Sequence, residues 1–364
     1  MSLQHSPSIV TNGLVMYYDM ANTARSFKGM PTTNLIGNPN SGINITSSDV
    51  PAGVQVPGYF STSSGYNVID WSVTPTAATG GTFTSSVYMR SPGGVSTYLM
   101  YIYTGTGPDG GWYGPASGAL TSSWQRYSGA ISGYTGTIST MRIYRVNSLG
   151  TIEIAAPQLE ATSFATPFIY GTRSNTQAIL DLTNNNTLTA TNLAYASDNT
   201  FSFSGSNSYI TAPSSSTVAF GAGDFTIGCW IYPSTVSGYT HMIALPDQGT
   251  FALKSETGTG NIYFYTPGWT SYGSTPGWTL TANAWNYVVF TRSASVGYAY
   301  LNGVSYGSKT GFTNSFTAQI LNIHNGWLTE FVDCKLPTAQ IYNRALTATE
   351  VAQNFNALRS RYGI

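Results

Sequence analysis

Two glycine-containing motifs match patterns found in enzymes. Residues 303–307 read GVSYG, the G-x-S-x-G spacing that places a nucleophilic serine on a sharp strand-to-helix turn. Here Ser305 follows an Asn-Gly pair and lies in strand-like sequence, so the required helix is missing. Residues 105–110 read GTGPDG, the G-x-G-x-x-G spacing of dinucleotide-binding loops. That motif must open a helix, yet GWYGPASGAL follows it, so neither motif predicts catalysis.

Carboxylates are scarce, which bears on glycoside hydrolysis. That reaction normally needs two carboxyl groups at the glycosidic bond, one as acid and one as nucleophile or base. The chain has 14 Asp and Glu residues, most of them isolated in the sequence. Glu330 and Asp333 are three apart, so in a strand their side chains would point to opposite faces. The sequence therefore predicts a protein that is not an enzyme, with polysaccharide degradation as the alternative.

Aromatic side chains are abundant, and they suit sugar binding. Aromatic rings pack against the apolar faces of pyranose rings, while amides and hydroxyls bind their edges. Three groups of Trp and Tyr residues lie in sequence that is typical of loops, because it contains many Gly and Pro residues or, for the third group, Asn. They are the candidate glycan-binding residues Trp269, Tyr272 and Trp278, then Trp112 and Tyr113, then Trp327 beside His324. Loop packing, or burial against another subunit, is the competing interpretation. Trp124, Trp230 and Trp285 lie in strand motifs and are expected in the core.

The charge composition narrows the class of protein. Of 364 residues, 8% are charged, against about 25% in a typical domain. Lys plus Arg number 14 and Asp plus Glu also number 14, so the chain lacks the basic surface of a nucleic-acid-binding protein. The 14% of aromatic residues argue against a disordered chain. No stretch reaches the roughly 18–20 apolar residues that span a membrane. Segments rich in Val, Ile, Tyr and Thr, bounded by Gly, Pro and Asn, predict strands throughout.

Two local patterns predict particular elements. Asn302 and Gly303 lie between strand-like segments, and this pair favours a type I′ hairpin because both residues tolerate positive φ. Thr347 and Glu350 have the spacing of a helix capping box, and apolar residues then recur at i, i+4 and i+7. The sequence thus predicts an all-β chain with one short C-terminal helix.

The order of the strand motifs resembles one family. The segments FTIGCWIYP (225–233), NAWNYVVFTR (283–292), AYLNGVSYG (299–307) and AQIYNRALTATEV (339–351) resemble successive parts of concanavalin A-like, laminin-G-type jelly rolls. The segment that resembles this family's first strand, GLVMYYDMANTARSF, lies far upstream at 13–27. The block between them has its own beginning and end. It is similar to carbohydrate-binding-module-like sandwiches, through SSWQRYSGAI and AAPQLE.

The sequence therefore predicts two β-sandwich domains, one inserted into a loop of the other, since loop insertions are tolerated. Residues 1–30 would form an N-terminal arm and the first strand of the jelly roll. Residues 31–170 would form the inserted sandwich, and 171–364 the rest of the jelly roll. Residues 1–12 lack periodicity and could be a docking arm. Three domains in series are the alternative.

Metal and cofactor sites are weakly indicated. The laminin-G resemblance implies that loop acids could bind calcium, with Asp19, Asp181 and Asp198 as candidates; turn formation is the alternative interpretation. No other cofactor is expected, because the sequence has no EF-hand loop and no Cys/His cluster. Cys229 and Cys334 lie in apolar strand-like sequence and are expected to be buried free thiols.

Together the two sandwiches resemble lectin-like phage virion proteins. The resemblance implies a non-enzymatic protein of the virion surface, in a tail fibre, a baseplate appendage or a capsid decoration, that binds host-surface polysaccharide. Implied partners are other virion proteins and further copies of the chain, usually as a homotrimer. Nucleic acid and membrane insertion are not expected. A structural decoration protein without ligand is the second alternative, beside the polysaccharide-degrading enzyme.

Overall fold

The chain folds into two units, each built from antiparallel sheets. The computed structural model describes residues 8–22, 25–29, 31–52, 54–64, 67–73, 81–93, 96–104, 111–133, 137–146, 150–195, 201–204, 206–214, 216–245, 251–266, 277–324 and 332–364. One unit, here called the jelly-roll unit, comprises Met1–Met30 and Asn175–Ile364. The other, called the inserted unit, is Pro31–Ser174, which lies between those two segments in sequence. The second boundary thus falls at 174 rather than at the expected 170.

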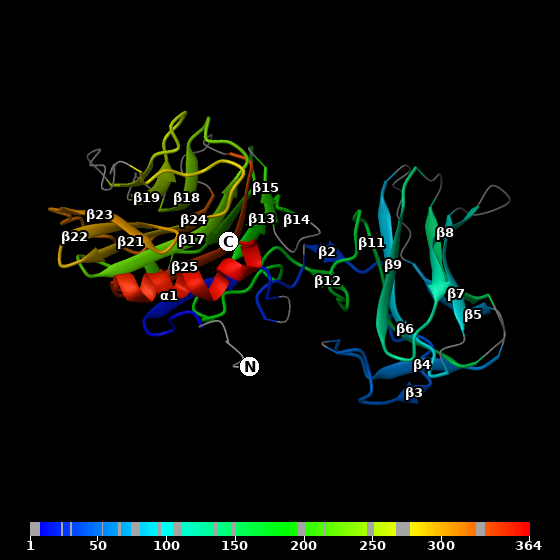
Figure 1. The fold of residues 1–364 in the computed structure, drawn as a ribbon. Helices are drawn as coiled ribbons and strands as arrows, with labels where there is room; N and C mark the ends of the chain where they lie inside the picture. The colour runs from blue at the N-terminus through cyan, green and yellow to red at the C-terminus, as the bar shows by residue number, and fades with distance from the viewer. Residues whose placement is uncertain are drawn as a thin grey trace. The chain divides into compact units, whose positions relative to one another are not determined.

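The jelly-roll unit has two sheets (Figure 1). The larger sheet has the strand order β14-β15-β25-β17-β21-β22-β23, and β1 also pairs with β25. Its strands are β1 Leu14–Asp19, β14 Ala194–Tyr195, β15 Phe201–Phe203, β17 Phe225–Pro233, β21 Asn286–Ser293, β22 Val296–Leu301, β23 Val304–Thr310 and β25 Cys334–Tyr342. The smaller sheet has the order β13-β16-β24-β18-β19-β20. Its strands are β13 Thr189–Thr191, β16 Tyr209–Ala212, β18 Thr240–Leu245, β19 Phe251–Ser255, β20 Ile262–Tyr265 and β24 Leu321–Ile323.

Aromatic side chains fill the space between these two sheets. Phe264 of the smaller sheet stacks on Phe290 of the larger sheet, with ring centroids 4.1 Å apart. The ring of Phe225, also on the larger sheet, lies 5.9 and 6.1 Å from those two rings. All three side chains are buried. Such ring pairs contribute about 0.5–1.5 kcal/mol each beyond the burial of apolar area, so they fix the two sheets together.

Helix α1 covers the outer face of the larger sheet (Figure 1). Within the described residues the helical elements are η1 Ser216–Val218, α1 Ala348–Leu358 and η3 Arg359–Tyr362. The predicted capping box is confirmed: Thr347 accepts a hydrogen bond from the Glu350 backbone, and the Glu350 carboxylate accepts one from the Thr347 backbone. On the buried side of the helix, Phe355 stacks on Trp230 at 5.5 Å. Among the described residues, no helix has the length and apolar character to cross a membrane.

The hairpin between β22 and β23 turns where the sequence predicts. Asn302 and Gly303 have φ values of 51° and 79°, and positive φ at both positions is what a type I′ turn requires. A Cβ atom on Gly303 would lie 3.0 Å from the Phe355 ring. Glycine therefore also lets helix α1 pack closely over the hairpin.

The segment before β1 packs against the same helix. The Val10 amide donates to Asn354 Oδ1 at 2.7 Å, and the Tyr342 hydroxyl donates to the Val10 carbonyl at 2.9 Å. The expectation of a docking arm over residues 1–12 is therefore wrong for 8–12, because buried hydrogen bonds hold them, and residues 1–7 lie outside the described chain. Strand β1 then pairs with β25 from Leu14↔Tyr342 to Asp19↔Thr338.

The inserted unit is a sandwich of a four-stranded and a five-stranded sheet (Figure 1). The first has the order β5-β10-β7-β8 and the second β3-β4-β11-β6-β9, while β2 pairs with β12. Its strands are β2 Thr32–Thr33, β3 Ile45–Thr46, β4 Gly58–Thr62, β5 Asn67–Ser72, β6 Phe83–Arg90, β7 Thr97–Thr104, β8 Gly111–Ala119, β9 Gln125–Ile131, β10 Ile138–Arg145, β11 Ile152–Glu160 and β12 Thr172–Arg173. Apolar side chains from both sheets, including Val87, Met100 and Ile143, form its separate core.

Candidate functional site

The aromatic residues expected to bind glycans do not share one environment. Trp278 is fully buried in the core of the jelly-roll unit, and its indole N–H donates to the Tyr300 carbonyl at 3.1 Å. It offers no ring face to a ligand, so the expectation is wrong at this residue: a large aromatic next to a Gly- and Pro-rich segment can still be core. Trp269, Tyr272 and Trp327 lie outside the described residues.

Trp112 and Tyr113 follow Gly111 at the start of strand β8 and point to opposite faces of its sheet. Trp112 is 43% exposed, one of the most exposed large apolar side chains among the described residues. Tyr113 packs against the core of the inserted unit instead, as alternation along a strand requires. Trp112 therefore remains a candidate for ligand contact, whereas Tyr113 is corrected to a core-facing residue.

Three tyrosines extend the surface around Trp112. The Tyr103 and Tyr101 rings lie 4.8 and 6.0 Å from the Trp112 ring, and the Tyr144 ring lies 6.4 Å from Tyr101. All three tyrosines are half-buried. The four rings, called here the aromatic strip, run across β10, β7 and β8 on the outer face of the four-stranded sheet. Gly114 keeps the strip open, since a Cβ there would lie 3.3 Å from the Tyr101 ring.

An ion pair borders the aromatic strip. Arg142 Nε and Nη2 bind the two Asp70 carboxylate oxygens at 2.6 and 2.5 Å, and the guanidinium lies 4.3 Å from the Trp112 ring centroid. The hydrogen bonds to Asp70 raise the pKa of Arg142 above its usual value. Across these four strands the remaining charged residue is Arg145, which is fully buried. The strip is therefore flanked by a compensated pair and has no net charge.

A second arginine cluster lies on the outer face of the five-stranded sheet. Arg90 binds Asp49 at 2.6 Å and Glu153 at 2.5 Å, and it lies 4.5 Å from the Trp124 ring centroid. The Trp124 indole N–H donates to the Asp49 carbonyl, and the Tyr59 ring packs edge-on against it. Trp124 was expected in the core; it is instead half-buried at the surface.

The acidic residues expected to bind calcium are used by other groups. Asp181 accepts hydrogen bonds from the Tyr17, Thr183 and Asn186 backbone amides and from two side chains. Asp19 accepts from the Tyr17 hydroxyl, the Ala21 amide and, at 2.6 Å, the Arg361 guanidinium. These donors would compete with a cation at both residues, and the calcium site stays a prediction. Asp198 lies outside the described residues, and the described side chains form no other metal-ligand cluster.

The two cysteines are free and buried, as expected. Burial raises the pKa of both thiols, so neither is a nucleophile near neutral pH.

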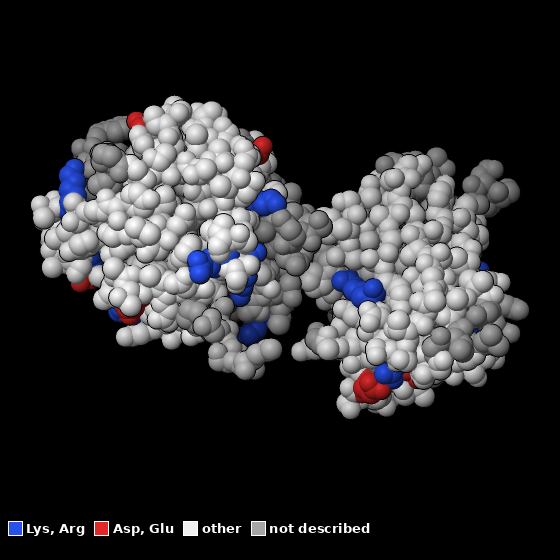
Figure 2. Space-filling model, viewed as in Figure 1, with Lys and Arg blue, Asp and Glu red and all other residues white. Residues whose placement is uncertain are grey.

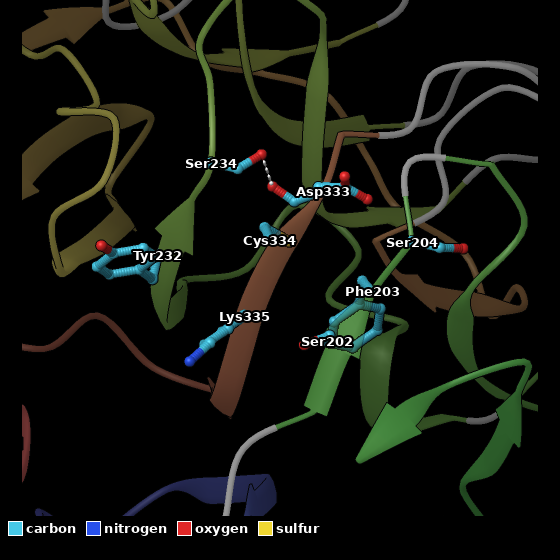
Figure 3. Close-up of a pocket in the computed structure, with 8 residues that line it drawn as sticks. All are labelled: Ser202, Phe203, Ser204, Tyr232, Ser234, Asp333, Cys334 and Lys335. Carbon is cyan, nitrogen blue, oxygen red and sulfur yellow. Dashed lines mark hydrogen bonds between the residues drawn. The ribbon is translucent and has the colours of Figure 1, made fainter. Parts of the chain in front are cut away.

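A hollow of about 360 Å³ lies on the jelly-roll unit (Figure 3). It is formed where β15, β25 and β17 run side by side. Its lining residues are Ser202, Phe203, Ser204, Tyr232, Ser234, Asp333, Cys334 and Lys335. Sequence reasoning did not single out these residues as a site, since they come from three segments spread over more than 130 positions.

Sequence reasoning also missed most of the aromatic strip. Tyr101 and Tyr103 lie in STYLMYIYT, where the residues facing the core and those facing solvent are both apolar or aromatic. A sheet with one solvated face usually alternates apolar and polar residues. In this strand both the inward-facing and the outward-facing positions carry aromatic residues. That departure from the usual pattern was the available signal that the outer face binds something.

Comparison with known proteins identifies the class of one domain. Residues 203–352 match a laminin G family model described as the concanavalin A-like lectin/glucanases superfamily. No curated protein matches the chain.

Several solved structures are similar to part of the chain. The binding domain of Paraclostridial Mosquitocidal Protein 1 is 20% identical, with a TM-score of 0.41 and coverage of 49% of each chain. The botulinum neurotoxin serotype D ligand binding domain, solved with N-acetylneuraminic acid, is 15% identical (TM-score 0.42; 50% of this chain, 49% of that one). Domain 4 of AbnA, a GH43 extracellular arabinanase from Geobacillus stearothermophilus solved with arabinotriose, is 18% identical (TM-score 0.41; 50% and 92%). The chain spans about half the length of the two toxin structures. The protein is an all-β chain whose jelly-roll unit contains a concanavalin A-like lectin/glucanase domain.

Proposed function

We propose that this protein is a non-enzymatic, glycan-binding protein of a phage virion surface. In this proposal the aromatic strip of the inserted unit contacts polysaccharide on the host envelope. The single observation that carries the binding function is the exposed Trp112 ring, continued by three tyrosines and flanked by a neutralised ion pair.

The chemistry of the strip suits an uncharged sugar chain. Pyranose rings present C–H groups on one face, and these pack on aromatic rings. The strip crosses three strands, and neighbouring strands lie about 4.8 Å apart, so it is longer than one sugar ring. Asp70 and Arg142 lie beside it. The Arg142 N–H groups that do not bind Asp70 can donate to sugar hydroxyls, and the Asp70 carboxylate can accept from them. A neutral oligosaccharide bound along its length fits this surface best.

The carboxylates of the two candidate sites support binding rather than hydrolysis. Among the described residues, the strip has one carboxylate, Asp70, and the hollow has one, Asp333. Asp70 is held in a two-point ion pair, so both of its carboxylate oxygens already accept hydrogen bonds from Arg142. Glycoside hydrolysis normally uses two carboxyl groups about 5–10 Å apart. We expect no new reducing ends when the protein is incubated with algal and bacterial polysaccharides.

The virion location rests on the motif resemblance and on the composition of the chain. A chain with no net charge and only 8% charged residues suits dense packing against copies of itself and other virion proteins. A homotrimer in a tail fibre, a baseplate appendage or a capsid decoration is the proposed assembly. Quantitative proteomics of purified particles should detect the chain at a fixed ratio to the major capsid protein. If it is never detected there, the location is wrong.

Affinity electrophoresis of the full chain in gels containing neutral polysaccharides tests the binding function. We expect retardation of the wild type in at least one gel, and a loss of at least tenfold in affinity for Trp112→Ala. Trp124→Ala is the matched control, because it removes an indole stacked on arginine from the other face of the same unit. Equal losses for both variants would contradict the assignment. If no glycan retards the wild type, a purely structural decoration protein becomes the better interpretation.

A further inference from the structure

The hollow between β15, β25 and β17 has a mostly apolar lining, to which strand register adds a few polar groups. Lys335 on β25 lies opposite Ser202 on one side and Tyr232 on the other. These three residues therefore share one face of the larger sheet. Their neighbours Phe203 and Cys334 point into the core. The pairing of β17 with β25 is irregular between Trp230 and Tyr232, and such irregularities redirect side chains near binding sites.

The tyrosine wall of the hollow is held in place by other rings. The Tyr232 ring meets the Trp285 ring edge-on at 5.2 Å, and Trp285 in turn lies 4.3 Å from Tyr362. Tyr362 packs at 4.4 Å on Trp230, which is fully buried. These contacts connect Tyr232 to the apolar cluster between the larger sheet and helix α1. The Tyr232 ring is therefore preorganised for a ligand, which lowers the entropic cost of binding.

The charges of the hollow are separated. Lys335 Nζ lies 6.0 Å from the Tyr232 ring centroid, while the Asp333 carboxylate points the other way (Figure 3). The Ser234 amide and hydroxyl both donate to the Asp333 carbonyl at 2.8 Å, which fixes that rim. Figure 2 shows further Lys and Arg side chains around the C-terminal end of α1. The end of the hollow next to Lys335 thus carries the positive charge, and the Asp333 carboxylate is directed away from it.

We propose that this hollow binds a single sugar residue bearing an anionic group, a carboxylate or a phosphate. Lys335 pairs with the anionic group, and the Tyr232 ring packs against the apolar face of the sugar. Ser202, which lies opposite Lys335, binds a hydroxyl group of the sugar. The volume of about 360 Å³ is near the lower end of ligand pockets, roughly 300–1,000 Å³, and suits one ring rather than a chain. The site is independent of the aromatic strip, which lies in the other unit.

The test is titration calorimetry of the full chain with glucuronate, glucose 6-phosphate, glucose and inorganic phosphate. We expect one of the two anionic sugars to bind at least tenfold more tightly than glucose or phosphate alone, and the pair distinguishes a carboxylate from a phosphate preference. Lys335→Met removes the charge but keeps an unbranched side chain only one atom shorter, and it should reduce that affinity at least tenfold. Lys309→Met, an exposed lysine on edge strand β23, is the matched control and should leave it unchanged.

Three outcomes would overturn the proposal. They are failure of both anionic sugars to bind, unchanged affinity in Lys335→Met, and phosphate binding as tight as that of glucose 6-phosphate, which would indicate an anion site without sugar recognition. Tyr232→Leu provides a second variant and should weaken the sugar but not inorganic phosphate. Retained polysaccharide binding at the aromatic strip, together with an unchanged melting temperature, would show that the variants remain folded.

Discussion

The two outer faces of the inserted unit carry the same chemical grouping in different surroundings. On one face Arg142 lies 4.3 Å from Trp112 and binds Asp70; on the other Arg90 lies 4.5 Å from Trp124 and binds Asp49. The Arg142 side chain is 25% exposed and Asp70 44%, and three tyrosines continue the surface. The Arg90 side chain is 14% exposed and holds a second carboxylate, Glu153, that is 10% exposed.

The difference teaches that neighbours decide what such a grouping does. On the five-stranded sheet, the indole N–H of Trp124 is bonded to the backbone of Asp49, and Arg90 joins three elements. That arrangement fixes a loop to the sheet. On the four-stranded sheet, the ion pair only borders the exposed rings. The same interaction stabilises the fold in one place and leaves a surface ready for a ligand in the other.

The largest expected effect is a difference in the free energy of unfolding between variants of Arg90 and Arg142. Arg90→Met leaves Glu153 largely buried without its cation, which should lower the free energy of unfolding by about 2 kcal/mol. Arg142→Met breaks a more exposed pair and should cost about 0.5–1 kcal/mol. Urea unfolding of the full chain, followed by fluorescence, measures both. Equal losses would mean that the two clusters play the same structural role.

The next effect is a difference in polysaccharide affinity between variants on the two outer faces of the inserted unit. Tyr101→Ala removes the middle ring of the aromatic strip and should weaken polysaccharide affinity about tenfold, which corresponds to about 1.4 kcal/mol. Tyr59→Ala removes the ring beside Trp124 and should leave affinity within twofold. Affinity electrophoresis compares the two variants. A loss in Tyr59→Ala as large as that in Tyr101→Ala would show that both faces bind glycan.

A smaller effect tests the charge balance of the strip. Asp70→Asn leaves Arg142 without its carboxylate, so a polymer of uronic acids should gain a few-fold in affinity at low salt and lose that gain near 0.5 M salt. Binding of neutral polysaccharide should change less. Asp49→Asn on the other face is the control, since Arg90 there keeps Glu153. No gain in Asp70→Asn would mean that the ion pair does not control selectivity.

The smallest effect is a pH dependence at Asp49. The hydrogen bonds from Arg90 lower the pKa of Asp49 below its usual value. Because the folded pKa is depressed, its contribution to stability is present above the unfolded pKa of about 3.9 and disappears as pH falls through the folded value. Wild type and Asp49→Asn should therefore differ slightly in melting temperature at pH 6 and coincide near pH 2. A difference that grows on acidification would contradict this sign.

Local patterns predicted the elements of the fold well. The Asn302-Gly303 turn and the Thr347–Glu350 capping box depend on neighbouring residues, so the sequence contains the whole signal. Strands such as 225–233 could be predicted equally well, because a run of β-branched and aromatic residues is bounded by Gly, Pro or Asn.

The site was less readable because exposure is a property of the packed molecule. Trp112 and Trp278 both lie next to glycine-rich sequence, yet one is 43% exposed and the other fully buried. Nothing local distinguishes them. Arg142 comes beside Trp112 only through pairing of β10, β7 and β8. Pairing partners 30 residues apart are not encoded by spacing alone.

Strand β1 has a consequence for the order in which the chain acquires structure. The Tyr18 hydroxyl binds the Leu336 carbonyl, 318 positions later in the chain. A ribosome adds about 5–20 residues per second, so β1 would be synthesised roughly tens of seconds before β25 exists to receive it. The contacts within Pro31–Ser174 are complete long before that. The inserted unit would therefore mature first on the ribosome, while the strand that precedes it stays unpaired until the last part of the chain is made.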